Sequence, residues 1–480
     1  MGEPIAEELQ GSIHSISPKP HFTKRPYPMR MLALLLLALL PPTLGAQELD
    51  TAEFAARRAK LLAKIPDGIA VVLGGIEHPH PVRFRQSPDF YYLTGIEEPG
   101  AVLVLNGVTK NAAVFAVKRP DFGPSVTPRL RDVEDAEKRF GLPVQPMESF
   151  FTFLTFAGSN AAVKKLYLQL TPPDAQIHAR FEAQIFAAQA MDHPLFGQPQ
   201  PYALAVDRIR EAESHLEAAD VSPLLDELRW VKTPYEVERL RRSGKLGAEA
   251  TAEAMRATRP GMYEYEIAAA AQYVSTRLGA DGDAFPPIVP SGPLTPIVHY
   301  MENRRQMQAG EIVYMDYGSD WEYYTSDITR TWPVSGRFTA EQEKMYRCVL
   351  EARNAIIAAM KPGVTLTGLK DAAERVYARH GYRNEFLGTG RYIGHFVGIS
   401  VHDVGGISGA WAEKPFTVGV VFNVEPILQF PDRKIHLRLE DTVLLTEKGP
   451  ENLTAAVPAE VDAVYALIKE KGVNSEPVGR

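Results

Sequence analysis

Four carboxylates and one histidine in the second half of the chain occupy stretches with the character of strands. They are Asp316 (in VYMDYG), Asp327 (in YTSDITRT), His395 (in YIGHFVG), Glu425 (in FNVEPI) and Glu440 (in LRLEDT). Carboxylate oxygens and imidazole nitrogens are ligands that suit divalent metal ions. Four carboxylates in one cleft would repel one another, whereas two cations would neutralise them. Two such ions can also hold a shared hydroxide and stabilise a tetrahedral intermediate. These residue types therefore favour a dinuclear metal centre.

A single aspartate on a strand is more often a solvated edge charge or a turn residue than a ligand. Glu425 and Glu440 are harder to dismiss, because each follows an apolar residue inside a strongly apolar stretch. A carboxylate in a buried strand needs a partner. The two glutamates thus strengthen the metal hypothesis beyond what each aspartate carries alone.

The composition limits the other classes of partner. The 480 residues include 52 Lys and Arg against 59 Asp and Glu, which gives a net charge of −7. This balance argues against nucleic acid or an anionic membrane surface, since both select basic patches. Hydrophobic residues make up 45% and charged residues 23%, as in globular proteins. The one cysteine, Cys348, excludes disulfides within the chain and cysteine-rich zinc sites.

The hydrophobic pattern divides the chain into two domains, over 47–222 and 223–480, with the boundary near 221–232. In the first domain we expect strands at 68–74, 101–105, 112–117 and 165–169 and helices at 174–192 and 207–219, which is an α/β pattern. In the second we expect helices at about 234–258, 263–278, 339–360 and 367–379. Its strands are expected at 311–317, 323–333, 418–428 and 435–445, as a largely antiparallel, curved sheet. A Gly318-Ser319-Asp320 turn would return Asp327 beside Asp316. The tyrosine pairs 91–92 and 323–324 are expected to pack within strands.

The N-terminus has the layout of an export signal. Residues 31–40 read MLALLLLALL, basic residues precede them, and small residues follow at Gly45 and Ala46. Ten apolar residues are too few to span a bilayer, which needs about 20. Residues 1–46 are therefore predicted to be a signal peptide with a mis-called N-terminal extension. The protein is then exported, periplasmic or secreted, without a stable membrane anchor. An uncleaved anchor or a buried strand is the alternative.

The second half resembles the pita-bread metallopeptidases, and most closely their Xaa-Pro aminopeptidase (aminopeptidase P) and prolidase branch. The matching text, in family order over about 223–470, is IVPSGPLTPIVHYMEN, VYMDYGSDWEYYTSDITRTWPVSG, GHFVGISVHDVG, VEP and LRLEDTVLLTEKGPENLT. The first half is similar, more weakly, to the family's N-terminal domain through RQSPDFYYLTGIEEPGAVLVL. The resemblance implies an α+β fold, with a C-terminal pita-bread (creatinase/aminopeptidase) domain and a smaller N-terminal α/β domain.

The resemblance also implies a role for each matched residue. Asp316 would bind one metal ion through both oxygens, Asp327 and Glu440 would bridge two ions, and His395 and Glu425 would complete the second ion's ligands. Glu425 would also act as general base. His299 would hold substrate or stabilise the intermediate, and His402 would lie near the scissile bond. Arg438 would fix a ligand carboxylate from two residues before Glu440. Taken outside these motifs, His299 and His402 are better explained as structural histidines.

One motif departs from the family pattern. The family usually reads His-Gly-x-Gly-His before the ligand histidine, whereas here Arg391 and Tyr392 replace the first two residues. Arg391 stays protonated and cannot act as a neutral imidazole. It is either a surface or ion-paired arginine, or it reaches into the pocket and grips a substrate carboxylate with two hydrogen bonds.

By resemblance, the leading functional hypothesis is a metal-dependent exopeptidase, an Xaa-Pro aminopeptidase that hydrolyses the bond before a proline in the second position. Two divalent ions are expected, Mn first, with Co or Zn as alternatives. A prolidase-like dipeptidase would use the same ligands. Creatinase-like chemistry without metal, or a non-catalytic binding protein, would not need the complete ligand set. The resemblance further implies a homo-oligomer, a dimer or a tetramer, acting on peptides and not on nucleic acid.

Overall fold

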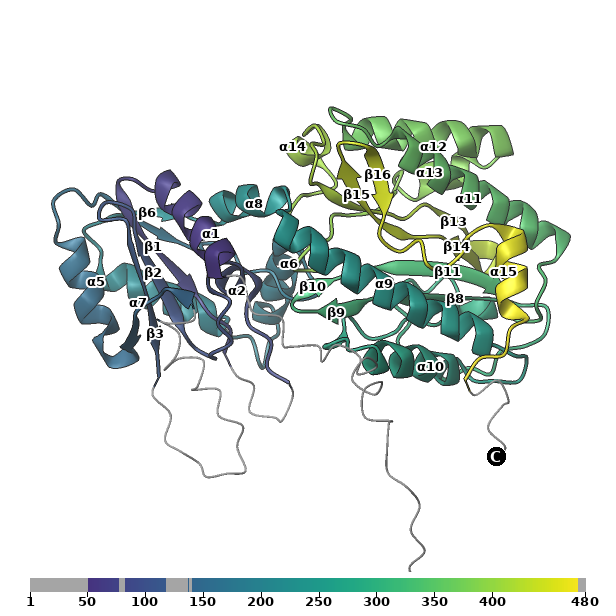
Figure 1. The fold of residues 1–480 in the computed structure, drawn as a ribbon, viewed down its shortest axis with the longest axis horizontal. Coiled ribbons are helices and arrows are strands. Elements are labelled where there is room, and N and C mark those ends of the chain that lie inside the picture. Colours follow the sequence, from purple (N-terminus) through teal and green to yellow (C-terminus); the bar gives the residue numbers. More distant parts are fainter. Residues whose placement is uncertain (1–50, 77–82, 118–136, 138–139, 474–480) are drawn as a thin grey trace, which may run out of the picture. The chain divides into compact units, whose positions relative to one another are not determined.

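The computed structural model describes residues 51–76, 83–117, 137 and 140–473. The predicted signal segment, residues 1–46, lies outside these ranges. Asp50–Arg480 forms one compact unit, shown as a ribbon in Figure 1. Within the described ranges, no helix is both long enough and apolar enough to cross a membrane.

The first part of the compact unit is built on one six-stranded sheet with the strand order β4-β3-β2-β1-β5-β6. The strands are β1 (Gly68–Leu73), β2 (Val102–Asn106), β3 (Asn111–Ala116), β4 (Val144–Pro146), β5 (Lys165–Leu168) and β6 (Glu217–Asp220). The helices are α1 (Thr51–Lys64), α2 (Pro88–Thr94), α5 (Phe150–Gly158), α6 (Arg180–Met191), α7 (Pro201–Ala212) and α8 (Ser222–Trp230). Strand β1 pairs antiparallel with β2 and parallel with β5, so the sheet is mixed. The four strands expected from the sequence are confirmed.

The two helices expected in this part are only partly right. The first was expected from residue 174, but α6 begins at Arg180, because the carbonyls of Gln176 and Ile177 accept from Val401 and His402 instead of from a helical turn. The second was expected over 207–219, but α7 starts earlier, at Pro201, where proline suits the first turn. Residues 217–220 instead pair parallel with β5 as the edge strand β6, so sheet pairing overrides the local helical pattern.

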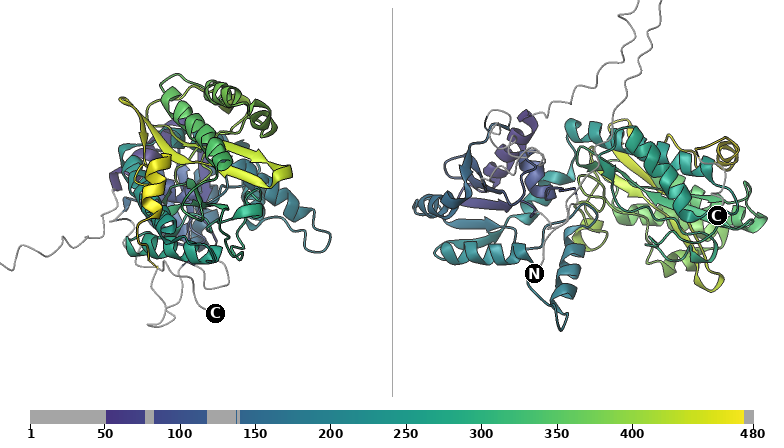
Figure 2. Two further views of the ribbon diagram at one scale, coloured as in Figure 1. Left: turned by 90° about the vertical axis from the view of Figure 1, so that its right-hand side faces the viewer. Right: turned by 90° about the horizontal axis from the view of Figure 1, so that it is seen from below.

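The second part carries strands β7 (Gly282–Asp283), β8 (Ile312–Tyr317), β9 (Ser319–Trp321), β10 (Tyr324–Thr325), β11 (Ile328–Pro333), β12 (Val421–Val424), β13 (Ile427–Phe430), β14 (Ile435–Arg438), β15 (Asp441–Thr446) and β16 (Gly449–Asn452). Its helices are α9 (Pro234–Ala257), α10 (Glu264–Arg277), α11 (Ala340–Ala359), α12 (Leu366–His380), α13 (Arg383–Gly388), α14 (Gly409–Ala412) and α15 (Val461–Ile468). Three short 3₁₀ turns complete the described elements, at Met147–Ser149, Gly292–Leu294 and Pro431–Arg433. All strand pairs of this part are antiparallel, as expected. Helix α11 packs against β12, β13 and β14, and Figure 2 shows the green helix lying over these yellow strands.

The start of helix α9 follows directly from its sequence. The Thr233 hydroxyl accepts a hydrogen bond from the Glu236 backbone N–H, and the Glu236 carboxylate accepts one from the Thr233 N–H at 3.0 Å. This reciprocal capping, with Pro234 in the first turn, satisfies N–H groups that the helix itself leaves unpaired. The helix therefore begins at the residue that the sequence indicates.

Three local expectations are wrong. The strand expected over 323–333 is divided into β10 and β11 by Ser326 and Asp327, and Tyr323 lies outside both. The turn expected at Gly318-Ser319-Asp320 is strand β9, and the chain reverses instead at Glu322 and Tyr323, both with positive φ. The Tyr91–Tyr92 pair lies in helix α2 and not in a strand, because Pro88 starts a helix there. Its packing role is nevertheless borne out, since the Tyr91 ring stacks on that of Tyr323 with centroids 3.5 Å apart.

A buried network of ion pairs joins segments that are distant in the sequence. Arg229, at the end of α8, contacts Asp89 at 2.8 Å, Asp174 at 2.6 Å and Asp403 at 2.5 Å. Lys232 also contacts Asp403, at 2.9 Å. Each of these five side chains is at most 1% exposed. Buried charges are stable only when they are paired and hydrogen-bonded, so this network fixes how 174 and 403 lie beside α8.

Candidate metal centre

The five ligand-type residues lie at strand ends and breaks. Asp316 is in β8, and Asp327 comes just before β11. His395 precedes Phe396, which forms an isolated bridge to β12. Glu425 lies between β12 and β13, and Glu440 lies between β14 and β15. Strands were expected to run unbroken through both glutamates, and this is wrong at Glu425 and Glu440. The chain leaves the ladder at these two residues, which frees each carboxylate from the alternation of a regular strand.

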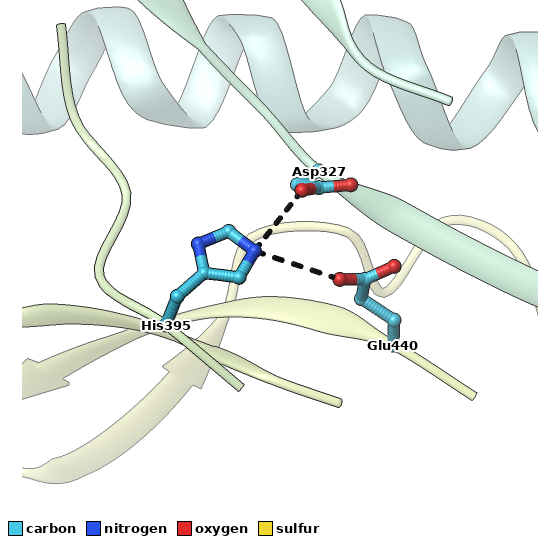
Figure 3. A group of neighbouring side chains, drawn as sticks. All are labelled: Asp327, His395 and Glu440. Atoms are coloured by element: carbon cyan, nitrogen blue, oxygen red, sulfur yellow. Dashed lines mark ion pairs between the residues drawn. The ribbon is translucent and has the colours of Figure 1, made fainter. Parts of the chain in front are cut away.

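Three of the five side chains face one another directly. His395 Nε2 lies 3.3 Å from Asp327 Oδ2 and 3.9 Å from Glu440 Oε1. Figure 3 marks these two ion pairs with dashed lines. One ligand atom from each of Asp327, His395 and Glu440 lies within 4.8 Å of the others, and all three residues are buried. A single cation between them would contact an imidazole nitrogen and two carboxylate oxygens, which is a donor set that divalent metals accept.

Arg438 joins the other two carboxylates to this group. Its guanidinium donates to Asp316 Oδ2 at 2.5 Å and to Glu425 Oε1 at 2.9 Å. Glu425 Oε2 in turn lies 3.9 Å from His395 Nε2. The five predicted ligands and Arg438 therefore form one contiguous buried cluster, although whether each binds metal stays a prediction.

Two residues that the sequence did not single out hold Glu440 in place. The Thr329 hydroxyl donates to Glu440 Oε2, and the Asn423 side-chain amide donates to Glu440 Oε1 at 2.5 Å. Thr329 lies opposite Asp316 in the β8–β11 pairing. Neighbours that fix a ligand carboxylate in this way orient it toward the ion. The DITRT motif offered a signal for Thr329, but Asn423 carried none by itself.

The electrostatics of the cluster favour a cation. Burial, together with the charges of Asp316 and Glu425, raises the pKa of Asp327 well above its usual value. Burial raises the pKa of Glu440, and so do the neighbouring negative charges, of which Asp327 has the largest effect. Burial opposes ionisation of Glu425 too, but Arg438 and His395 outweigh it and lower its pKa. One oxygen each of Asp316 and Asp327 is buried without a hydrogen-bond partner in the described structure. Such oxygens need a partner, and divalent ions would supply it, so the residues fit the metal.

The cluster opens into a cavity of about 740 Å³. His299 and His402, both expected to act on substrate, line this cavity together with the five ligand-type residues and Arg438. The His402 ring lies 4.2 Å from the His395 ring, centroid to centroid, and so sits beside the cluster. The His299 side chain is exposed to solvent at the cavity wall. A cavity of this size accommodates a short peptide end next to the carboxylates.

Comparison with known proteins then decides the family. The profile of metallopeptidase family M24 matches residues 238–447, and that of the aminopeptidase P N-terminal domain matches residues 54–166. The Xaa-Pro aminopeptidase of Escherichia coli is 31% identical over 468 residues, which cover 88% of this chain and 100% of that protein. The chain belongs to the Xaa-Pro aminopeptidases of metallopeptidase family M24. It is therefore a metal-dependent exopeptidase of the hydrolase class.

Solved structures of this family agree with the predicted fold. Proline aminopeptidase P II from Yersinia pestis is 27% identical, with a TM-score of 0.70, and the match covers 88% of this chain and 99% of that one. The α+β fold with an aminopeptidase P N-terminal domain is thus confirmed. A Xaa-Pro dipeptidase from Pyrococcus furiosus is 31% identical, but the match covers only 52% of this chain and 70% of that protein.

The departure from the aminopeptidase P motif has a clear structural explanation for Arg391. This residue has φ 59°, and its guanidinium pairs with Asp371 and with Glu374, which lies 3.0 Å from its Nε. Both acids belong to α12, and Arg391 does not line the cavity. Of the two interpretations, the ion-paired arginine agrees with this structure and the substrate-gripping arginine does not.

Replacing Arg391 by alanine is therefore expected to leave the KM of free-acid Xaa-Pro substrates within about twofold of the original value. The ion pairs with Asp371 and Glu374 are part-exposed, so their loss costs about 0–1 kcal/mol. Steady-state kinetics with a free-acid substrate and with its C-terminal amide test this. A selective rise in KM for the free acid would return Arg391 to the substrate site.

Tyr392 is the second residue that departs from the family motif, and unlike Arg391 it faces the cavity. Its hydroxyl donates to Glu425 Oε2 at 2.6 Å, and the residue lines the cavity. Where the family motif has a glycine, this chain thus places a hydroxyl on a predicted ligand. With Arg438 on the other oxygen, both oxygens of Glu425 have a fixed hydrogen-bond donor. Residue type alone could not show that Tyr392 turns inward while Arg391 turns outward.

Proposed function

We propose that this aminopeptidase releases the first residue of peptides that carry proline in the second position. The observation that carries the proposal is the buried group of Asp327, His395 and Glu440, which lines a cavity together with His299 and His402. Two divalent ions, Mn before Co or Zn, would be held by Asp316, Asp327, His395, Glu425 and Glu440. When bound, they would lower the pKa of a shared water and polarise the carbonyl before proline.

The other steps of the reaction would depend on side chains of this chain, each with a separate role. Glu425 lines the cavity, where its carboxylate can take the proton of the attacking water as general base. Arg438 holds Glu425 and Asp316 at a fixed separation, so both ligands stay in position while the proton moves. His402 and His299, on the wall, can donate hydrogen bonds to the developing oxyanion or to the leaving proline nitrogen.

An aminopeptidase is favoured over a prolidase-like dipeptidase for two reasons. The match to the Escherichia coli Xaa-Pro aminopeptidase spans 88% of this chain, whereas the match to the dipeptidase spans 52%. A dipeptidase also benefits from a cation that binds the free carboxylate of its substrate, and Arg391, the candidate for that role, is paired with Asp371 and Glu374. The metal-free and non-catalytic alternatives do not explain the unpartnered buried oxygens of Asp316 and Asp327.

The test compares an Xaa-Pro dipeptide with an Xaa-Pro-Xaa tripeptide. The protein is stripped with a chelator, reloaded with Mn, Co or Zn, and offered both peptides, with metal content measured on the same samples. We expect release of the first residue from the tripeptide, loss of activity on stripping, and two ions bound per chain at saturation. Cleavage of the dipeptide alone would move the assignment to prolidase, and one ion per chain would contradict the dinuclear centre.

We also propose that the protein is exported. The support is the sequence of residues 31–46, which has an apolar run followed by small residues, in a part of the chain that the structure does not describe. N-terminal sequencing of the protein from the periplasm and the medium of the producing cells is expected to find chains that begin near Gln47. Full-length protein retained in the cytoplasm would argue against export.

Assembly into a homodimer or homotetramer is a further proposal that rests on the family alone. Light scattering on the purified chain is expected to give a mass two or four times that of the 53.1 kDa monomer. A monomeric mass at micromolar concentration would contradict it.

A further inference from the structure

His402 has a partner from a helix more than two hundred residues earlier in the chain. Its ring Nδ1 lies 2.8 Å from each carboxylate oxygen of Glu182, which sits in the first turn of α6. The two side chains are 25% and 21% exposed, so the pair lies at the edge of the cavity, partly shielded from water. The region around Glu182 offered no interpretable motif in the sequence.

Glu182 is held rigidly for this contact. Its carboxylate also accepts from the Ala179 backbone N–H at 2.9 Å, which ties it to the start of α6. The preceding Arg180 contacts Asp89 at 2.8 Å and Asp226 at 2.7 Å, so the start of the helix is fixed in the buried network.

The backbone of the same segment runs beside the His402 loop. The Val401 N–H donates to the Gln176 carbonyl at 2.7 Å, and the His402 N–H donates to the Ile177 carbonyl at 3.1 Å. Two backbone hydrogen bonds and the buried ion pairs of both segments support this side-chain contact. They restrict the movement of the two side chains relative to each other. The geometry of Glu182 and His402 is therefore set by the fold.

We propose that Glu182 is a positioning residue that fixes the orientation and the tautomer of His402, an inference that rests on the proposed function for its catalytic consequence. Because Glu182 accepts at Nδ1, the Nδ1 atom of the neutral ring carries the proton. Nε2 is then the nitrogen available to the substrate side of the cavity. A carboxylate that orients a histidine in this way leaves Nε2 free to accept a proton, after which Nε2–H can donate a hydrogen bond to an oxyanion.

The kinetic test is a double-mutant cycle on the full chain loaded with metal. Glu182→Ala is expected to lower kcat on the tripeptide by about 10- to 100-fold with KM changed by less than about threefold. Glu182→Gln should recover much of this loss, because the amide oxygen still accepts from Nδ1. In a His402→Ala background, removing Glu182 should change kcat by less than about twofold. Gln184→Ala, on the exposed side of α6, is the matched control and should change nothing.

These outcomes separate positioning from a purely structural role. If Glu182 only caps α6, its removal would cost as much in the His402→Ala background as in the unmodified protein, and additive losses would overturn the inference. Unchanged kinetics of Glu182→Ala in an active protein would overturn it as well.

A second measurement does not depend on activity. It records the ring nitrogens of His402 in the full chain, labelled with ¹⁵N-histidine and loaded with zinc at pH 8. We expect its nitrogen shifts, identified by comparison with His402→Gln, to report the Nδ1–H tautomer and to change in Glu182→Ala. The Nε2–H tautomer in the unmodified chain would overturn the inference. Failure to cleave the tripeptide would instead count against the proposed function, and the shifts would still decide the role of Glu182.

Discussion

Glutamine in place of Glu425 is expected to lower kcat for Xaa-Pro-Xaa peptides by about 10³-fold or more while the protein stays folded. The substitution keeps the shape of the side chain but removes its charge. General-base catalysis alone is worth about 10²- to 10⁴-fold, and the loss of a ligand adds to that. Arg438 donates to Oε1 of Glu425 and Tyr392 to Oε2. In the glutamine variant Arg438 can still donate to the amide oxygen, and the Tyr392 hydroxyl can accept from the amide nitrogen. The fold should therefore survive the change.

Metal titration calorimetry on the same variant distinguishes the two roles of Glu425. We expect weaker binding of at least one ion, because one anionic ligand is lost, with the circular dichroism spectrum unchanged. Glu385→Gln, also on the wall of the cavity but outside the carboxylate cluster, is the matched control and should keep its activity within about threefold. Full activity of Glu425→Gln would contradict both the ligand and the general-base assignments.

The strands that carry the site were predictable, because alternating polar and apolar residues are a local property of the sequence. The pairing of β8 with β11, which brings Asp316 and Asp327 to one end of a ladder, follows from two such stretches close together in the chain. The breaks at Glu425 and Glu440 were not predictable. At each break the backbone stops pairing with its neighbouring strand, and the carboxylate contacts residues on other strands. No local sequence pattern encodes such contacts.

Contacts between segments that are distant in the chain could not be predicted from the sequence either. Glu182 lies in a region without an interpretable motif, and only the fold brings it to His402. Arg391 and Tyr392 were recognised as a departure, but which of them faces the cavity depends on the positive φ of Arg391 and on Asp371 and Glu374 in α12. Side-chain direction at such a turn is a property of the assembled fold.

Replacing Arg229 by methionine is expected to destabilise the protein more than any other substitution proposed above, by about 3–5 kcal/mol at pH 7. Methionine keeps the apolar stem but removes the charge that pairs with Asp89, Asp174 and Asp403. Those carboxylates would stay buried with less compensation. The unfolding midpoint in urea measures the effect. Arg241→Met, which removes an exposed pair with Glu451, is the matched control and should shift stability by less than about 0.5 kcal/mol.

The pH dependence of this loss has a definite sign. Burial disfavours the charged form of Asp89, but Arg180 and Arg229 outweigh it and lower its pKa from 3.8 to about 2. Burial also opposes ionisation of Asp403, and Lys232 and Arg229 again lower the pKa. A carboxyl whose pKa is lower in the folded state adds stability above its unfolded pKa and loses that contribution as the pH falls through its folded pKa. The difference in stability between the unmodified protein and Arg229→Met should therefore be largest at neutral pH and shrink below about pH 4.

A difference in stability that is independent of pH would mean that Arg229 acts through packing and not through its charge. The same variant should also lose activity, although Arg229 does not line the cavity. Asp403 follows His402 in the chain, and Asp174 begins the segment whose backbone bonds to Val401 and His402. Arg229 binds both aspartates, so one buried guanidinium fixes the loop that carries His402 and the segment that leads to Glu182. Its loss should lower kcat for the tripeptide in the folded protein while metal binding at the carboxylate cluster is kept.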